Sequence, residues 1–177
     1  MTLELPFETT RFEYVGPPEI REGVAGEKGV HIENVSDLEN FLAERQPSEL
    51  DEPFTYVVNE SGLLLLAPRR SEHVECSGGS PVLAAGEIGF SRDADDRRWE
   101  ARYVSNQSNG YCPDVESWVV VARVLDLAGI VHGMGFTHPI NFRKCSYCGN
   151  WNLVKEEVFV CALCDRELSV EVDNRRL

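Results

Sequence analysis

Two Cys-x-x-Cys pairs near the C-terminus constrain this chain more than any other feature. The first pair is Cys145 and Cys148 and the second is Cys161 and Cys164, with twelve residues between the pairs. Pairs at this spacing can place four thiolates around one ion, while the intervening residues form a hairpin that brings the pairs together. The spacing therefore predicts a closed, tetrahedral four-cysteine site for a structural Zn²⁺.

The residues around the cysteines favour the same interpretation. Gly149 follows the first pair and Asp165 follows the second, and both residue types tolerate the left-handed backbone that a metal-binding turn needs. Residues 152–155 and 158–160 are predicted as two strands between the pairs, joined at residues 156–157.

Other uses of these cysteines remain open or fit less well. Iron could take the same four ligands, so the spacing does not separate iron from zinc. Two disulfides are disfavoured because no signal peptide precedes them, and a redox role is disfavoured because two pairs at hairpin spacing suit one metal.

Residues 142–168 resemble the zinc-ribbon, or rubredoxin-like knuckle, group of metal modules. The resemblance rests on the four cysteines, Cys145, Cys148, Cys161 and Cys164. Members of this group bind nucleic acid, bind proteins or only hold a fold together. The resemblance thus implies the metal and leaves the function open.

The length and composition predict one folded body with an appended module. The chain has 177 residues, of which 42% are hydrophobic, enough for a real core. We expect an α+β body over residues 1–140 and the zinc ribbon, packed on it, over 141–177. The first residues have neither a basic nor an apolar leader region, and the apolar runs are too short to cross a membrane. A cytoplasmic location is therefore expected, and the excess of arginine over lysine favours a bacterial source.

The charge distribution disfavours nucleic acid as a partner. The formal net charge is −13, and residues 1–60 hold 14 acidic and 4 basic side chains. Residues 141–168 hold four of each, so the ribbon has no basic face for a phosphate backbone. The acidic half can face a basic partner, but an ordinary solvated surface is the better explanation of its charge. A protein or a small polar ligand is the expected partner.

Strand signals come mostly as hairpins, which predicts an α+β fold with an antiparallel sheet. Residues 54–58 and 63–67 form one expected hairpin, and residues 82–90 and 99–105 form another. Short strands are also expected at residues 12–15 and 30–32.

Two helices are predicted from their end signals. A capping box of Ser36 and Glu39 opens a helix over about residues 37–45. The stronger helix covers residues 114–128, starts at Asp114 and stops at Gly129. Apolar residues cover most of its circumference, so this late helix is expected to be central.

The loop over residues 103–113 is the second candidate site. It joins a strand to the late helix and is rich in uncharged hydrogen-bonding groups, which suit a small polar ligand or a peptide backbone. The candidate ligand-binding residues are Asn106, Gln107, Ser108, Asn109 and Tyr111. The alternative is a structural connector whose side chains satisfy buried backbone groups.

Cys112 is the candidate catalytic residue of this loop. A thiol near a helix start can have a lowered pKa, but a nucleophile also needs a base, and only His132 and His138 follow the helix. A buried, unreactive thiol is the better explanation of Cys112, because free cysteine is commonly buried. The sequence therefore favours a non-enzymatic binding or interaction module with a structural zinc ribbon; the alternative is a small thiol-dependent enzyme that uses Cys112 in a polar pocket formed by residues 103–113.

Overall fold

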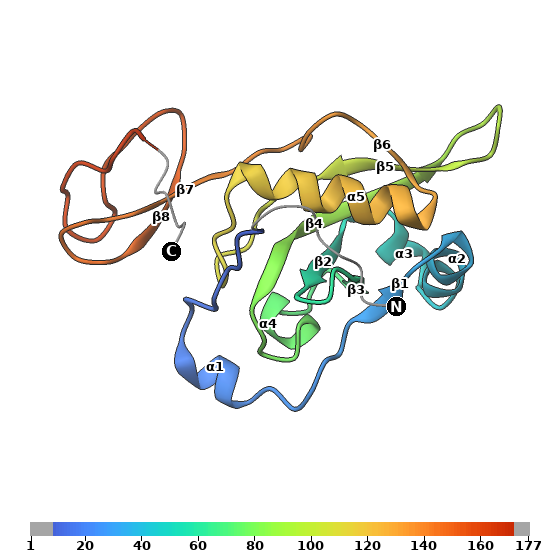
Figure 1. The fold of residues 1–177 in the computed structure, drawn as a ribbon, viewed down its shortest axis with the longest axis horizontal. Helices are drawn as coiled ribbons and strands as arrows, with labels where there is room; N and C mark the ends of the chain where they lie inside the picture. The colour runs from blue at the N-terminus through green and yellow to red at the C-terminus, as the bar shows by residue number, and fades with distance from the viewer. Residues whose placement is uncertain (1–8, 172–177) are drawn as a thin grey trace.

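The computed structural model describes residues 9–171, which form a six-stranded sheet and a separate two-stranded sheet (Figure 1). The larger sheet has the order β1-β3-β2-β4-β5-β6, and neighbouring strands are antiparallel except β5 and β6. Its strands are β1 (Val30–Ile32), β2 (Phe54–Asn59), β3 (Leu64–Ala67), β4 (Val82–Arg92), β5 (Trp99–Val104) and β6 (Val131–His132). The predicted class, α+β with a mostly antiparallel sheet, is confirmed.

The central strands are buried on both faces of the sheet. Side chains alternate across a strand, so Tyr56 and Val58 of β2 join one apolar cluster while Val57 joins the other. In β3, Leu64 and Leu66 belong to the first cluster and Leu65 to the second. Continuous apolar runs in β2 and β3 are the sequence pattern that this two-sided burial requires.

The helices of the described residues are α1 (Pro18–Glu22), α2 (Val35–Ala43), α3 (Pro47–Leu50), α4 (His73–Cys76) and α5 (Trp118–Ala128). Three of them, α2, α4 and α5, cover these faces, whereas α1 and α3 bury no residue. Apolar side chains of α2 and α5 pack in the first cluster, and those of α4 pack in the second. Figure 1 shows α5 along one side of the sheet and α4 on the other.

The predicted helix starts differ from the observed ones. Helix α2 begins after Asn34, whose side chain accepts the Asp37 N–H, so the capping box lies two residues before the predicted one. Helix α5 begins at Trp118, because residues 115–117 form a 3₁₀ turn after Asp114. Gly129 has a φ of 72° and ends α5 in the left-handed conformation.

Two segments outside the main strands also differ from expectation. Residues 12–15 make only a single bridge, from Phe12 to Val82, instead of a strand. The stretch after α5, for which no strand was predicted, contains β6, which pairs in parallel with β5 at the edge of the sheet. The other edge is β1, so both edges of the larger sheet are strands of two or three residues.

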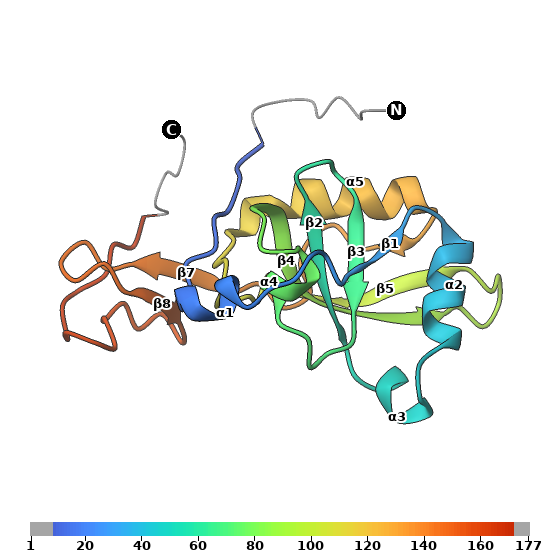
Figure 2. The ribbon, with the colours of Figure 1, turned by 90° about the horizontal axis from the view of Figure 1, so that it is seen from below.

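The smaller sheet pairs β7 (Asn141–Lys144) with β8 (Trp151–Val154) in antiparallel register. This hairpin encloses the first cysteine pair, whereas the sequence predicted strands 152–155 and 158–160 between the two pairs. Glu156 and Glu157 both have positive φ, 50° and 58°, and turn the chain away after β8. Figure 2 shows β7 and β8 at one end of the molecule, with α2 and α3 near the other.

No helix within residues 9–171 combines the length and the apolar character needed to cross a lipid bilayer.

Candidate functional site

The four cysteine sulfurs lie together at the end of the β7–β8 hairpin. The Sγ atoms of Cys145 and Cys164 are 3.7 Å apart, those of Cys148 and Cys161 are 3.6 Å apart, and all four lie within 4.8 Å of one another. A metal with four thiolate bonds of about 2.3 Å requires sulfurs about 3.8 Å apart, the edge of a tetrahedron. Disulfide sulfurs would be about 2.05 Å apart, and all four cysteines are free. The cluster therefore fits one metal ion.

Each pair is shaped by the same backbone turn. The Gly149 N–H donates to the Cys145 carbonyl and the Asp165 N–H donates to the Cys161 carbonyl, both at 2.9 Å. Gly149 has a φ of 76° and Asp165 a φ of 57°, the left-handed conformation expected from the sequence at both positions. Two equivalent turns thus present two sulfurs each toward a common centre.

Backbone N–H groups within the turns favour the thiolate form of the first cysteine of each pair. The Cys148 N–H has the largest effect on the pKa of Cys145 and lowers it. Burial acts to raise the pKa of Cys161, but hydrogen bonds from the N–H groups of Leu163 and Cys164 and from the side chains of Cys148 and Asn152 together outweigh it and lower that pKa to about 6. The thiolate is the form that binds a metal.

Asn152 of β8 supports this cluster and was not singled out from the sequence. Its side chain is buried; its Nδ2 lies 3.6 Å from the Cys161 sulfur, and its Oδ1 accepts the Ala162 N–H at 2.9 Å. Asn152 thereby ties the first hairpin to the second cysteine pair. The sequence did offer one signal for Asn152: asparagine is uncommon in strands, so its presence in the strand predicted over residues 152–155 could have marked it as a residue with a special role.

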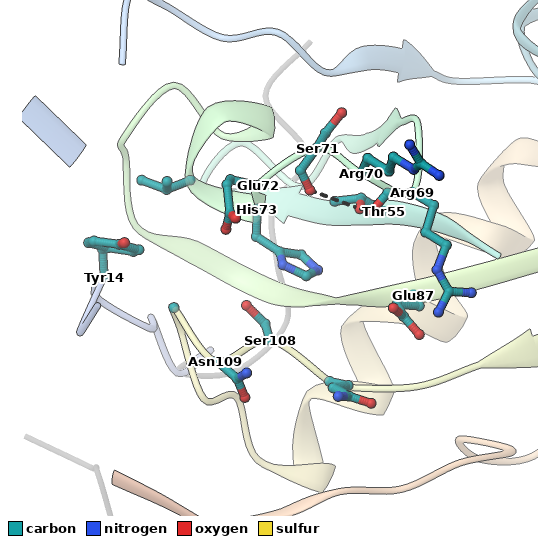
Figure 3. Close-up of a pocket in the computed structure, with 13 residues that line it drawn as sticks. Tyr14, Thr55, Arg69, Arg70, Ser71, Glu72, His73, Glu87, Ser108 and Asn109 are labelled. Atoms are coloured by element: carbon teal, nitrogen blue, oxygen red, sulfur yellow. Dashed lines mark hydrogen bonds between the residues drawn. The ribbon is translucent and has the colours of Figure 1, made fainter. Parts of the chain in front are cut away.

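A polar pocket of about 450 Å³ lies on the body, beside the loop that the sequence selected as a ligand site (Figure 3). Gln107, Ser108 and Asn109 line it together with the segment that follows β3, residues 69–74. Thr55 Oγ1 hydrogen bonds to the Arg69 and Ser71 carbonyls and holds that segment in place.

The other two predicted ligand residues have structural hydrogen bonds. Asn106 is fully buried; its Nδ2 donates to the Pro113 and Ile140 carbonyls, and its Oδ1 accepts the Ile140 N–H. The Tyr111 hydroxyl is buried and hydrogen bonds to Ser77 Oγ and to the Ser80 carbonyl. Asn106 and Tyr111 thus hold the loop in place through hydrogen bonds on its buried side, while Gln107, Ser108 and Asn109 line the pocket.

Several pocket residues with charged or titratable side chains, among them Arg69, Arg70 and His73, were not predicted as ligand residues. Arg69 and Arg70 follow β3 directly, and His73 begins α4. The His73 Nε2 lies 2.9 Å from the Gly86 carbonyl, and burial lowers the pKa of His73. These residues are far in sequence from the loop at 107–110. They become its neighbours only through strand pairing in the sheet, so no local sequence pattern could identify them.

Cys112 lies on the buried side of this loop and does not line the pocket. It is buried, has a φ of 45°, and its Sγ lies 3.4 Å from the Asn109 carbonyl oxygen. The two histidines proposed as bases have other hydrogen-bond partners, His132 on Asp126 and His138 on Thr137.

Comparisons with protein family models, curated proteins and solved structures returned no match to this chain.

Proposed function

We propose that this chain is a non-enzymatic binding protein whose C-terminal module, residues 141–177, holds a structural Zn²⁺. The observation that carries the proposal is the spacing of the four sulfurs, whose closest pairs are 3.6 and 3.7 Å apart, close to the edge of a tetrahedral thiolate site. Four protein ligands leave no open position for a substrate or a reactive water, so the ion stabilises the fold and takes no part in chemistry.

Zinc is proposed over iron because a closed four-cysteine site is the usual structural zinc site. The residues that would hold the ion are Cys145, Cys148, Cys161 and Cys164. Reduced thiols are required, so we also propose a cytoplasmic location. A ligand of small polar type is favoured by the pocket beside Gln107, Ser108 and Asn109, whereas the net charge of −13 opposes nucleic acid.

Metal analysis of the purified full chain tests the metal. We expect one zinc per chain, and no visible absorption of the kind that an iron–thiolate site gives. Cys148→Ser should abolish zinc retention, because Cys148 is exposed and its loss removes a ligand without opening the core. Cys112→Ser, at a cysteine outside the cluster, should retain one zinc.

Chelation tests the structural role of the ion. A strong chelator should lower the melting temperature of the native protein and leave that of Cys148→Ser nearly unchanged. An unaltered melting curve of the native protein after complete zinc removal would contradict the proposal.

A further inference from the structure

The pocket contains two arginines, Arg69 and Arg70, in a protein whose net charge is −13. Arg69 and Arg70 form no ion pair with any residue between positions 9 and 171. Five other arginines of the described residues pair with a carboxylate, as Arg92 does with Glu39 at 2.6 Å. Several others in this part of the chain, such as Arg97, lack an ion pair as well, so it is the position of Arg69 and Arg70 in a pocket that sets them apart. Guanidinium groups match the planar oxygens of carboxylates and phosphates, so this end of the pocket suits an oxyanion.

Ser108 supplies an independent sign of a missing partner. Its side chain is 1% exposed and lines the pocket, and its Oγ has no hydrogen-bond partner among the described residues. In Figure 3 its hydroxyl points from the loop toward the His73 side of the pocket. A buried hydroxyl without a partner is unfavourable, and this one belongs to a residue in the wall of the pocket.

His73 adds an acceptor on the opposite wall. Because the Gly86 carbonyl can only accept, the His73 Nε2 carries the proton, and the lowered pKa keeps the ring neutral. The Nδ1 atom therefore has a free lone pair. A hydroxyl or amide group of a ligand can donate a hydrogen bond to this Nδ1 atom. Other such groups of the ligand can hydrogen bond to Ser108 and Asn109.

The carboxylates of the pocket limit the charge of the ligand. Glu72 and Glu87 also line it, so a polyanion would be repelled. The arginines border a second hollow as well, which Ser48, Glu49 and Glu52 also line. That hollow offers one hydroxyl beside two carboxylates, whereas the Ser108 side offers Gln107, Ser108 and Asn109.

We propose that this pocket binds a small molecule that carries one oxyanion group, a carboxylate or a phosphate, and several hydroxyl or amide groups. The oxyanion lies at Arg69 and Arg70, and the neutral polar groups bond to Ser108, Asn109 and His73. This assignment rests on the proposed binding function and names its ligand class.

Calorimetric titration of the zinc-loaded full chain tests the ligand class. The carboxylate probe is gluconate and the phosphate probe is glycerol 3-phosphate; sorbitol and glycerol are their uncharged counterparts. We expect at least one acid to bind, at least about tenfold more tightly than its uncharged counterpart, since a charge-assisted hydrogen bond contributes that factor or more. The acid that binds identifies the oxyanion. Equal binding of acid and uncharged probe, or no binding of either acid, overturns the proposal.

Variants locate the site. Arg69→Gln and Arg70→Gln should each weaken binding of the acid about tenfold. Arg102→Gln, an exposed arginine paired with Glu100 outside the pocket, should bind normally. Ser108→Ala should weaken binding without lowering the melting temperature, because it removes an unpartnered hydroxyl; a residue needed only for folding would lower the melting temperature instead. Unchanged affinity in all three pocket variants overturns the site.

Zinc content measured on the same samples separates the two proposals. Chains that hold one zinc and bind neither acid refute only the ligand class. If the purified chains lack zinc, the proposed zinc-holding C-terminal module is refuted, whether or not the chains bind the acids.

Discussion

Close backbone packing at single residues determines how the pocket is built. Gly86 of β4 faces the backbone of Ser105, and a Cβ at this position would overlap the Ser105 carbonyl oxygen. The same oxygen accepts the Tyr56 hydroxyl at 2.9 Å, and the Gly86 carbonyl contacts His73. One residue without a side chain therefore lets the sheet, the loop over residues 103–113 and α4 meet.

Gly86→Ala should destabilise the protein by about 2 kcal/mol or more, because the added methyl group forces the strand and the Ser105 backbone apart. Urea unfolding of the zinc-loaded protein measures this. Gly135→Ala is the matched control, since a Cβ there meets no atom within 4 Å. Equal unfolding midpoints for the two variants would contradict the packing argument.

The two cysteines outside the metal cluster should be unreactive in the native state. Cys76 and Cys112 are at most 2% exposed, and burial raises the pKa of Cys76 to about 12. Below that pH its thiolate, the reactive form, is scarce. Iodoacetamide labelling at pH 8, read by mass spectrometry, should modify both residues only after urea is added. Rapid native labelling of Cys112 would instead support the thiol-enzyme alternative.

At the scale of elements, helix ends and strand partners were the least predictable features. Two overlapping capping boxes fit residues 34–39, and the structure uses Asn34 with Asp37. Local sequence could not choose between them, because both offer a side-chain acceptor three residues before a carboxylate. The pairing of β7 with β8 was also missed. The apolar residues 158–160 favoured a strand that pairs with residues 152–155, but Glu156 and Glu157 have positive φ and turn the chain away, so β8 pairs with β7 instead.

Asn34→Ala should destabilise the protein by about 1 kcal/mol, the usual effect of losing an N-cap side chain. Ser36→Ala should change stability by less than about 0.5 kcal/mol, because Ser36 is exposed and lies inside the first turn. Chemical denaturation compares the two. A larger effect at Ser36 would restore the capping box predicted from the sequence.

At the scale of the whole molecule, the metal module and the body differ in how they are stabilised. The body has two apolar clusters, on either face of the sheet. Within the described part of the module, up to residue 171, the cluster has three buried members, and two of them, Cys145 and Cys161, belong to the proposed metal site. We therefore expect the body to keep its fold when the ion is removed.

Hydrogen exchange after chelation tests this division. Backbone amides of residues 141–168 should lose protection, whereas amides of β2 and β4 should keep theirs. Cys112→Ser should respond to the chelator in the same way. Simultaneous loss of protection throughout the chain would show that the two parts do not fold separately.

The sequence predicted features that depend on local patterns, and it missed those that depend on assembly. The α+β class followed from paired strand signals, and the metal cluster followed from cysteine spacing. The pocket combines residues from β2, β4, the segment after β3 and the loop at 107–110. Gln107, Ser108 and Asn109 were recognised by composition, but Arg69 and His73 become their neighbours only when the sheet forms.

The shortness of β1 and β6 affects how copies of this protein meet one another. Unpaired backbone groups at a sheet edge can template the addition of a strand from another chain, the first step toward fibrils. Here the outermost strands of the larger sheet offer three residues on one side and two on the other. At these two borders, a neighbouring molecule finds too few free hydrogen-bonding groups to begin a growing stack.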